Sequence, residues 1–272
     1  MENTFNDAAD NGKVEEVKSI LRKNPSLNVN WKSKERGATT ALYIACISGH
    51  DSVVSILLAH PDIDPNLKNT SGNTPFLIAC ANGNTSCVRL LLQDQRVMVN
   101  EPDNNGATPL WRAAYWGRHD VIKWWIGSGR EMNLGKPGDI SKTDAIGAAK
   151  ERRKTEVVSL LERFKKDASK TRSQVRLELG ITTGQSIHLL ISLHSLFFSF
   201  LGFDDLNFFF FLFFSFYFSL FLDFPVTTPP RLTREQYTSL LDMSDDLIAT
   251  FLGGKPVLTT GGLYFVLSSK SN

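Results

Sequence analysis

Three segments of the chain share one pattern and decide its fold. They read TALYIACISGHDSVVSILL (Thr40–Leu58), TPFLIACANGNTSCVRLLL (Thr74–Leu92) and TPLWRAAYWGRHDVIKWWI (Thr108–Ile126). Their first residues are 34 positions apart, and one alanine and one glycine in each segment keep the same spacing: Ala45, Ala79, Ala113 and Gly49, Gly83, Gly117. A fixed period of this length indicates structural units that stack on their neighbours.

Each unit is predicted to contain two short helices joined by a tight turn. The leading threonine can cap free backbone N–H groups, and proline is tolerated in the first turn of a helix. The small residues that follow, such as Ala79-Cys80, let neighbouring helices approach closely. The glycine stands where the first helix ends, because glycine adopts a positive φ without penalty. Apolar residues at helical spacing form the buried face of the second helix: Val53, Val54, Leu57 and Leu58.

These motifs resemble those of the ankyrin repeat family, whose pattern is T-P-L-H-x-A-A, then Gly-His, then V-V-x-x-L-L. Degenerate copies begin at Phe5 and at Thr143. The resemblance covers residues 4–166 and implies an all-α ankyrin repeat solenoid of about five units, two of them degenerate caps. The expected units lie near residues 4–36, 37–71, 72–105, 106–141 and 142–166.

The rest of the chain has a different composition. Residues 167–180 are charged and are predicted to form a capping helix. Residues 181–230 are rich in Phe, Leu and Ser, and 14 of the 19 phenylalanines lie between Phe197 and Phe224. Amphipathic spacing returns after Thr233, so residues 231–272 are predicted to hold an amphipathic helix and a tail. One face of that helix carries Tyr237, Leu240, Leu241, Leu247, Ile248, Phe251 and Leu252.

Two interpretations of residues 181–230 remain open. Codons made only of pyrimidines encode Phe, Leu, Ser and Pro, and in Leu206–Leu222 fifteen of seventeen residues are Phe, Leu or Ser. A retained intron translated in frame has this composition. Alternatively, about 20 apolar residues span a bilayer, so residues 187–222 fit a two-pass membrane hairpin. Lysine and arginine residues flank both ends of that hairpin, which would place both ends in the cytosol.

The sequence gives no support for an enzyme. It lacks a phosphate-binding G-x-x-x-x-G-K-[ST] motif, H-E-x-x-H, G-x-S-x-G and a C-x-x-C pair, so we expect no catalytic, cofactor-binding or metal-binding residues. Cys46 and Cys80 are expected to be small buried side chains, and His50 to be structural. The basic run Lys150–Lys154 is expected to be a solvated end turn, and the alternative is a nuclear-import or acidic-partner patch. No stacking aromatics alternate with its cations, so no nucleic-acid partner is expected.

The cellular location is expected to be intracellular, and cytoplasmic by default. Three cysteines form no pattern of close pairs, which is typical of a reducing compartment. The first residues, MENTFNDAADNGKVEEVK, show no basic start followed by an apolar run. If the hydrophobic hairpin is real, the alternative is a membrane-associated chain whose repeats face the cytosol.

The resemblance implies that the protein is a scaffold or adaptor that binds another protein. In this family the variable contacts lie at the ends of the first helices, in a concave groove, and at the loop tips. The pairs expected there are Ile47-Ser48, Ala81-Asn82 and Tyr115-Trp116, flanked by Asp10-Asn11 and Lys150-Glu151. The expected loop-tip contacts are Thr70, Ser71, Asn73, Asn104 and Asn105.

Tyr115 and Trp116 are the expected anchors, because exposed Tyr and Trp offer large rigid contact areas. The alternative is that the tail or the next unit covers them. Trp124 and Trp125 are expected to lie in the core. A membrane-tethered adaptor is the second functional hypothesis.

Overall fold

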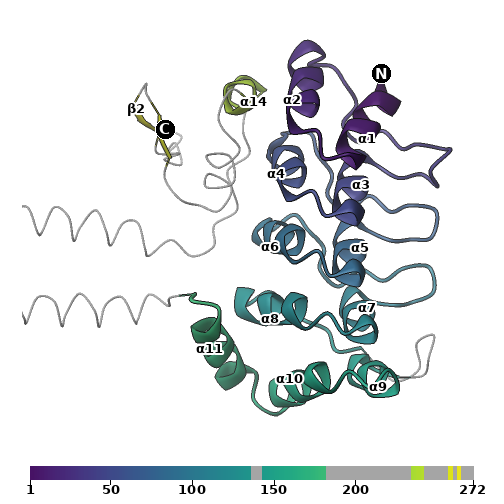
Figure 1. The fold of residues 1–272 in the computed structure, drawn as a ribbon, viewed down its shortest axis with the longest axis vertical. Coiled ribbons are helices and arrows are strands. Elements are labelled where there is room, and N and C mark those ends of the chain that lie inside the picture. The colour runs from purple at the N-terminus through teal and green to yellow at the C-terminus, as the bar shows by residue number, and fades with distance from the viewer. Residues whose placement is uncertain (136–142, 182–233, 242–256, 260–261, 265–272) are drawn as a thin grey trace, which may run out of the picture.

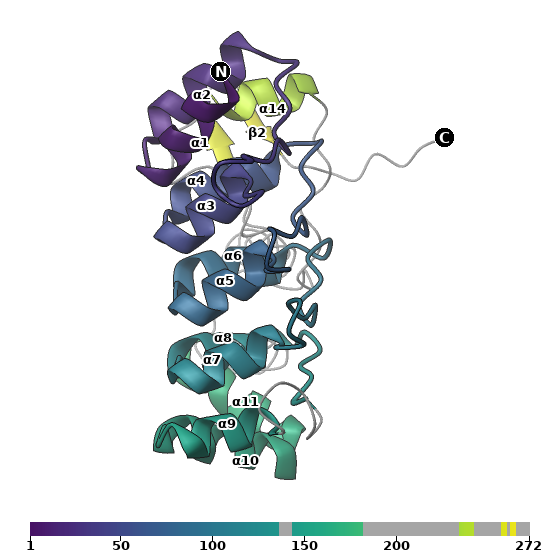
Figure 2. The ribbon, with the colours of Figure 1, turned by 90° about the vertical axis from the view of Figure 1, so that its right-hand side faces the viewer.

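The computed structural model describes residues 1–135, 143–181, 234–241, 257–259 and 262–264 of the 272-residue chain (Figure 1). The repeat region is built of helix pairs that stack in chain order, as Figure 2 shows along the long axis. The pairs are α1 (Glu2–Asp10) with α2 (Val14–Lys23), α3 (Ala41–Ser48) with α4 (Asp51–Ala59), α5 (Pro75–Asn82) with α6 (Thr85–Gln93), α7 (Pro109–Trp116) with α8 (His119–Ser128), and α9 (Ala145–Glu151) with α10 (Thr155–Lys166). The repeats are therefore all-α, as predicted.

The predicted helix boundaries follow from local chemistry. Thr40, Thr74 and Thr108 are the N-caps of α3, α5 and α7. Each side-chain oxygen accepts a hydrogen bond, 3.1–3.2 Å long, from the backbone N–H three residues later. The same helices end at glycines in the left-handed conformation, with φ of 80°, 83° and 73° for Gly49, Gly83 and Gly117. The predicted roles of threonine and glycine are confirmed.

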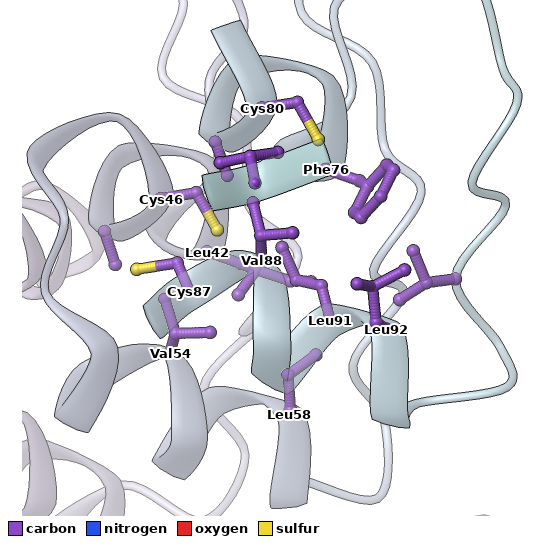
Figure 3. Packing of buried hydrophobic residues seen from close by; sticks show 14 of the residues in the cluster. Leu42, Cys46, Val54, Leu58, Phe76, Cys80, Cys87, Val88, Leu91 and Leu92 are labelled. Atoms are coloured by element: carbon purple, nitrogen blue, oxygen red, sulfur yellow. The ribbon is translucent and has the colours of Figure 1, made fainter. Parts of the chain in front are cut away.

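The core is one continuous apolar layer between the first and second helices of all units. Figure 3 shows part of this layer, around α3 to α6. Ala45, Ala79 and Ala113 are completely buried in equivalent places, where α3, α5 and α7 pack on one another. Trp125 is also fully buried, and its ring meets that of Phe76 edge to face at 5.0 Å between centroids. Burying a large side chain of this kind stabilises the fold by about 3 kcal/mol. The prediction that Trp125 belongs to the core is confirmed.

Arginines link the second helices of successive units. The last carbonyls of a helix have no partner within it, and side chains of the next unit supply donors here. Arg96 and Arg130, 34 residues apart, donate to such carbonyls of the preceding second helix, and Arg172 of α11 (Ala168–Glu178) repeats the arrangement at α8. The donor–acceptor pairs are Arg96 with Leu58 (2.6 Å), Arg130 with Leu92 (3.3 Å) and Arg172 with Ile126 (3.4 Å). Helix α11 thus extends the row of second helices beside α8.

A helix from the C-terminal region packs on the N-terminal units. Helix α14 (Arg234–Leu241) lies against α2 and α4 (Figure 1). Tyr237 is buried, its hydroxyl donates to the carbonyl of Ile56 over 3.1 Å, and its ring contacts that of His60. Arg22 donates to the carbonyl of Leu241. The predicted apolar face is confirmed at Tyr237 and Leu241, both of which are buried.

The remaining C-terminal elements are two short strands that the sequence did not predict. Strands β1 (Val257–Thr259) and β2 (Gly262–Tyr264) pair antiparallel, with Leu258 opposite Leu263. The other residues of the predicted apolar face lie outside the described residues or are described by backbone alone. The same is true of the phenylalanine-rich segment beyond Ile181 and of the proposed hairpin at residues 187–222. Among the helices of the described residues, none has the length and apolar character needed to cross a bilayer.

Candidate partner-binding groove

The predicted contact pairs occupy equivalent places at the ends of the first helices. Ile47-Ser48, Ala81-Asn82 and Tyr115-Trp116 are the last two residues of α3, α5 and α7. Ile47 and Trp116 are exposed, at 41% and 51%, whereas Ala81 is only 7% exposed. The Ala81 side chain therefore offers little surface to a partner. We call these three pairs the groove pairs.

Hydrogen bonds fix the spacing between the groove pairs. The Asn82 side chain donates to the carbonyl of Ile47 over 3.0 Å. The Ser48 hydroxyl donates to the carboxylate of Asp10 at the end of α1 over 2.9 Å. Asp10 also pairs with Arg36, so the N-terminal end of the groove is internally neutralised. A partner at that end would meet side chains that already have polar contacts.

Tyr115 and Trp116 have different environments. The Tyr115 ring stacks on the Trp111 ring with 4.9 Å between centroids. The guanidinium of Arg152 lies over the Tyr115 ring, 4.0 Å from its centroid. The next unit thus partly covers Tyr115. The rings of Trp116 and Tyr115 meet at an interplanar angle of 82°, with 5.2 Å between centroids, and half of the Trp116 surface is exposed. Tyr115 therefore supports the position of Trp116, which is the larger exposed surface.

A pocket of about 340 Å³ lies between α5 and α7, next to Trp116. This is within the range of volumes typical of ligand pockets. Four of its lining residues were predicted as contacts: Asn73, Ala81, Asn82 and Trp116. The full lining is Asn73, Leu77, Ile78, Ala81, Asn82, Arg112, Trp116 and Arg118. The structure thus brings a loop-tip residue and two groove pairs to one place.

The residue after each turn glycine joins its unit to the preceding one. Its side chain lies against the turn glycine of the preceding unit and hydrogen-bonds a carbonyl at the end of the first helix of that unit. His50, Asn84 and Arg118 contact the carbonyls of Asp10 (2.8 Å), Cys46 (2.7 Å) and Ala81 (2.9 Å) in this way. A Cβ added at Gly83 would lie 2.8 Å from the Arg118 side chain, so this close approach requires glycine. His50 is therefore structural, as predicted.

Arg112 and Arg118 both line the pocket, but their charges have different partners. The guanidinium of Arg112 binds the carboxylate of Asp103, whose side chain is 1% exposed. Arg118 contacts the Ala81 carbonyl through Nε. Within the described residues, no hydrogen bond or ion pair involves its two terminal nitrogens. Arg118 therefore contributes an uncompensated positive charge to the pocket.

The loop tips are joined from unit to unit. The backbone N–H of Thr70 donates to the carbonyl of Gly37 over 2.9 Å, and that of Asn104 to the carbonyl of Ser71 over 3.1 Å. The Asn104 side chain donates to the carbonyl of Thr70 over 2.9 Å. Thr70, Ser71, Asn104 and Asn105 are exposed, whereas Asn73 is half-buried beside the pocket. The Asn104 amide thus bonds within the protein, and the side chains of Thr70, Ser71 and Asn105 are left exposed to solvent.

The cysteines have no features of a reactive site. Cys46, Cys80 and Cys87 are free thiols buried in the core (Figure 3). Burial raises the pKa of Cys87 to about 12 and raises the pKa values of Cys46 and Cys80 well above the ordinary range. Such thiols stay protonated and are poor nucleophiles. The described residues contain no cluster of His, Cys, Asp and Glu that could hold a metal ion.

Sequence reasoning missed the two arginines of the pocket and Arg152. The signal for Arg118 was present: it occupies the repeat position of Asn84, directly after the turn glycine. The salt bridge of Arg112 and the contact of Arg152 with Tyr115 depend on side-chain packing between units, which the repeat pattern does not encode. Trp124 was expected in the core, and it is half-buried under the guanidinium of Arg89, which lies 4.1 Å from its ring centroid.

The stacked helix pairs, the turn glycines and the linked loop tips define a helical repeat protein of the solenoid type. Residues 4–69 and 61–136 match the family model for ankyrin repeats, three copies. The chain belongs to the ankyrin repeat family. No curated protein matches the chain. Ankyrin repeats are generally protein–protein interaction modules, and proteins built from them are typically not enzymes.

Proposed function

We propose that this chain binds another protein through the groove pairs, the pocket between α5 and α7 and the exposed loop tips, without catalysing a reaction. The observation that supports this most is Trp116. It is half exposed at the end of α7, its ring contacts that of Tyr115 at a nearly right angle, and it borders a pocket. Exposed, well-supported tryptophans are enriched among the residues that dominate binding energy.

The test compares Trp116→Ala with a matched control. Leu177 on α11 is 76% exposed and is not among the pocket residues, so Leu177→Ala removes a similar exposed apolar side chain elsewhere. The full chain and both variants are used to capture partners from cell extract, and the proteins bound are identified and then purified. We expect Leu177→Ala to retain the partner that the unchanged chain captures.

For Trp116→Ala we expect the affinity for that partner to fall at least 30-fold, which corresponds to about 2 kcal/mol. The thermal transition should move by less than about 2 °C, because the side chain is half exposed and fills no cavity. Equal capture by all three chains would contradict the proposal. A large loss of stability in Trp116→Ala would show instead that this residue acts in the core.

A membrane-tethered adaptor is the second candidate, and a sequence observation favours it. Leu206–Leu222 has no charged residue, and basic residues stand on both sides of the hydrophobic stretches. In this form the repeats would face the cytosol and the groove would bind the same partner. Fractionation of the full chain tests the idea: recovery with membranes that resists alkaline extraction supports it, and recovery in the supernatant contradicts it. Transcript reads across residues 181–230 test the retained intron.

A further inference from the structure

The pocket between α5 and α7 has the chemistry of a carboxylate receptor. We infer that it takes the side chain of an aspartate or glutamate from an acidic peptide segment of the partner, and that Arg118 is the cation that recognises it. This inference rests on the proposed function, because it assigns a class of partner to the same groove.

The geometry of Arg118 prepares it for this role. Its Nε donates to the Ala81 carbonyl over 2.9 Å, which fixes the plane of the guanidinium. Its side chain also lies across Gly83, where a Cβ would leave no room for it. The two terminal nitrogens have no partner within the described residues. A guanidinium binds a carboxylate best through two parallel N–H···O bonds, and a side chain that is already ordered loses little entropy on binding.

The charge balance of the pocket favours an anion. Its lining contains two arginines and no acidic residue. Asp103 lies just outside the pocket lining, is buried and binds Arg112. Its negative charge therefore compensates the charge of Arg112 and not that of Arg118. One net positive charge therefore remains. A single charge beside low-dielectric walls attracts an opposite charge more strongly than the same charge in open water.

Basic residues after α9 extend the preference for an anion from the pocket toward the C-terminal end of the groove. Arg152, Arg153 and Lys154 follow the groove end of α9 and are exposed, and Glu151 is the acidic residue among them. Lys150 is paired with Glu162 over 2.7 Å. An acidic segment that leaves the pocket toward α9 would thus meet a mostly basic turn. At the opposite end, Asp7 and Asp10 are both bound by Arg36.

The walls of the pocket fit a peptide. Ile78 and the Trp116 ring offer apolar surface to the methylene carbons of an acidic side chain and to a neighbouring apolar residue, and the buried Leu77 lies behind them. The side-chain amide of Asn82 borders the same space. A polyanion without such side chains would bind in proportion to its charge and to low salt, with little dependence on one pocket. This difference separates a peptide from a nucleic acid in the test.

The key variant is Arg118→Asn, because the chain already uses asparagine at this place. Asn84, one unit earlier, bonds the carbonyls of Cys46 and Ile47 through its side-chain nitrogen over 2.7 and 3.1 Å. Asparagine at position 118 can therefore keep the link between units while removing the positive charge. We expect the thermal transition of this variant to lie close to that of the unchanged chain.

The experiment selects binders from a displayed library of random peptides on the immobilised full chain, with parallel selections on Arg118→Asn and Trp116→Ala. We expect the unchanged chain to enrich peptides with Asp or Glu at a fixed distance from an apolar residue. A synthetic peptide from this pool should bind at least 10-fold more weakly to Arg118→Asn. Replacing its acidic residue by the corresponding amide should weaken binding to the unchanged chain by the same factor, with no further loss when both changes are combined.

Each other outcome decides against part of the reasoning. Peptides that depend on Trp116 but have no acidic residue, or that bind Arg118→Asn equally well, overturn this inference and leave the proposed function standing. A pool that depends on neither Trp116 nor Arg118 contradicts both. Salt-sensitive binding of a nucleic acid to the groove, equal in the unchanged chain and in Arg118→Asn, would replace the acidic peptide with a general polyanion.

Discussion

Two glycines at equivalent loop tips allow the stacking of the tips to be measured. Gly72 and Gly106 are 34 residues apart and have nearly the same backbone conformation, with φ of 78° and 84°. A Cβ at Gly72 would lie 2.5 Å from the backbone nitrogen of Asn104 in the next tip. At Gly106 no atom of the described residues lies within 4 Å of the added Cβ. Alanine at either position meets the same backbone strain, but among the residues that the structure describes only the Cβ at Gly72 also meets another unit.

The magnitudes follow from this comparison. A residue other than glycine in the left-handed region loses about 1 kcal/mol of stability, so Gly106→Ala should lower the free energy of unfolding by about that amount. Gly72→Ala should in addition separate the two tips. That disrupts the bond of Asn104 to the Ser71 carbonyl and the bond of its side chain to the Thr70 carbonyl. Each such bond contributes roughly 0.5–1.5 kcal/mol, which gives a total loss of about 2–4 kcal/mol for Gly72→Ala.

Urea unfolding followed by tryptophan fluorescence measures both variants. All five tryptophans lie within the repeats, and four of them are in α7 and α8, beyond the affected tips. The expected result is a lower midpoint for Gly72→Ala than for Gly106→Ala, with the dependence of free energy on urea unchanged. Equal losses in the two variants would refute the idea that the tips stabilise one another, and would leave backbone strain as the whole effect.

Three further predictions concern the core and the packing of α14. Trp125→Ala should lower the free energy of unfolding by about 3–5 kcal/mol, because it leaves a cavity, and a change below about 1 kcal/mol in calorimetry would contradict its burial. Tyr237→Phe removes the donor to the Ile56 carbonyl, so amide exchange in α14 should speed up several-fold; unchanged exchange would contradict this contact. Burial lowers the pKa of His60 below its ordinary 6.5, so the unfolded chain binds a proton first as the pH falls from 7 to 5. Stability should decrease over that window, and His60→Gln should remove this part of the pH dependence.

Much of the repeat architecture could be predicted from the sequence because its determinants are local. A threonine hydroxyl caps the N–H three residues away, and a glycine that ends a helix needs only its own φ. Both rules hold in α3, α5 and α7. The positions of the groove pairs were predictable for the same reason, since they are counted from the glycine. The burial of Ala81 was not, because burial depends on packing between units, as the bond of Arg118 to the Ala81 carbonyl also does.

The packing of α14 shows the opposite case. Its apolar face was visible in the sequence, and Tyr237 and Leu241 are buried as expected. The surface that buries them belongs to α2 and α4; Ile56 of α4 is 181 residues before Tyr237, and Arg22 of α2 is 219 residues before Leu241. Its specific contacts are a helix-end carbonyl, a histidine ring and the Arg22 side chain, none of which forms a periodic pattern. Periodicity therefore predicts that a face is covered, but the covering element has to be observed.

The pocket arginine, Arg118, occupies a position that tolerates several residue types. The position after the turn glycine has one structural requirement, a side-chain donor that reaches the carbonyl of the preceding first helix. Asparagine and arginine meet this requirement in successive units, and the histidine of the second unit contacts the equivalent carbonyl. Asparagine uses its one side-chain nitrogen for the link, whereas Arg118 uses Nε and keeps its two terminal nitrogens for other acceptors. Partner recognition can therefore vary from unit to unit at this position without loss of the stacking, provided that the residue placed there has a donor to spare.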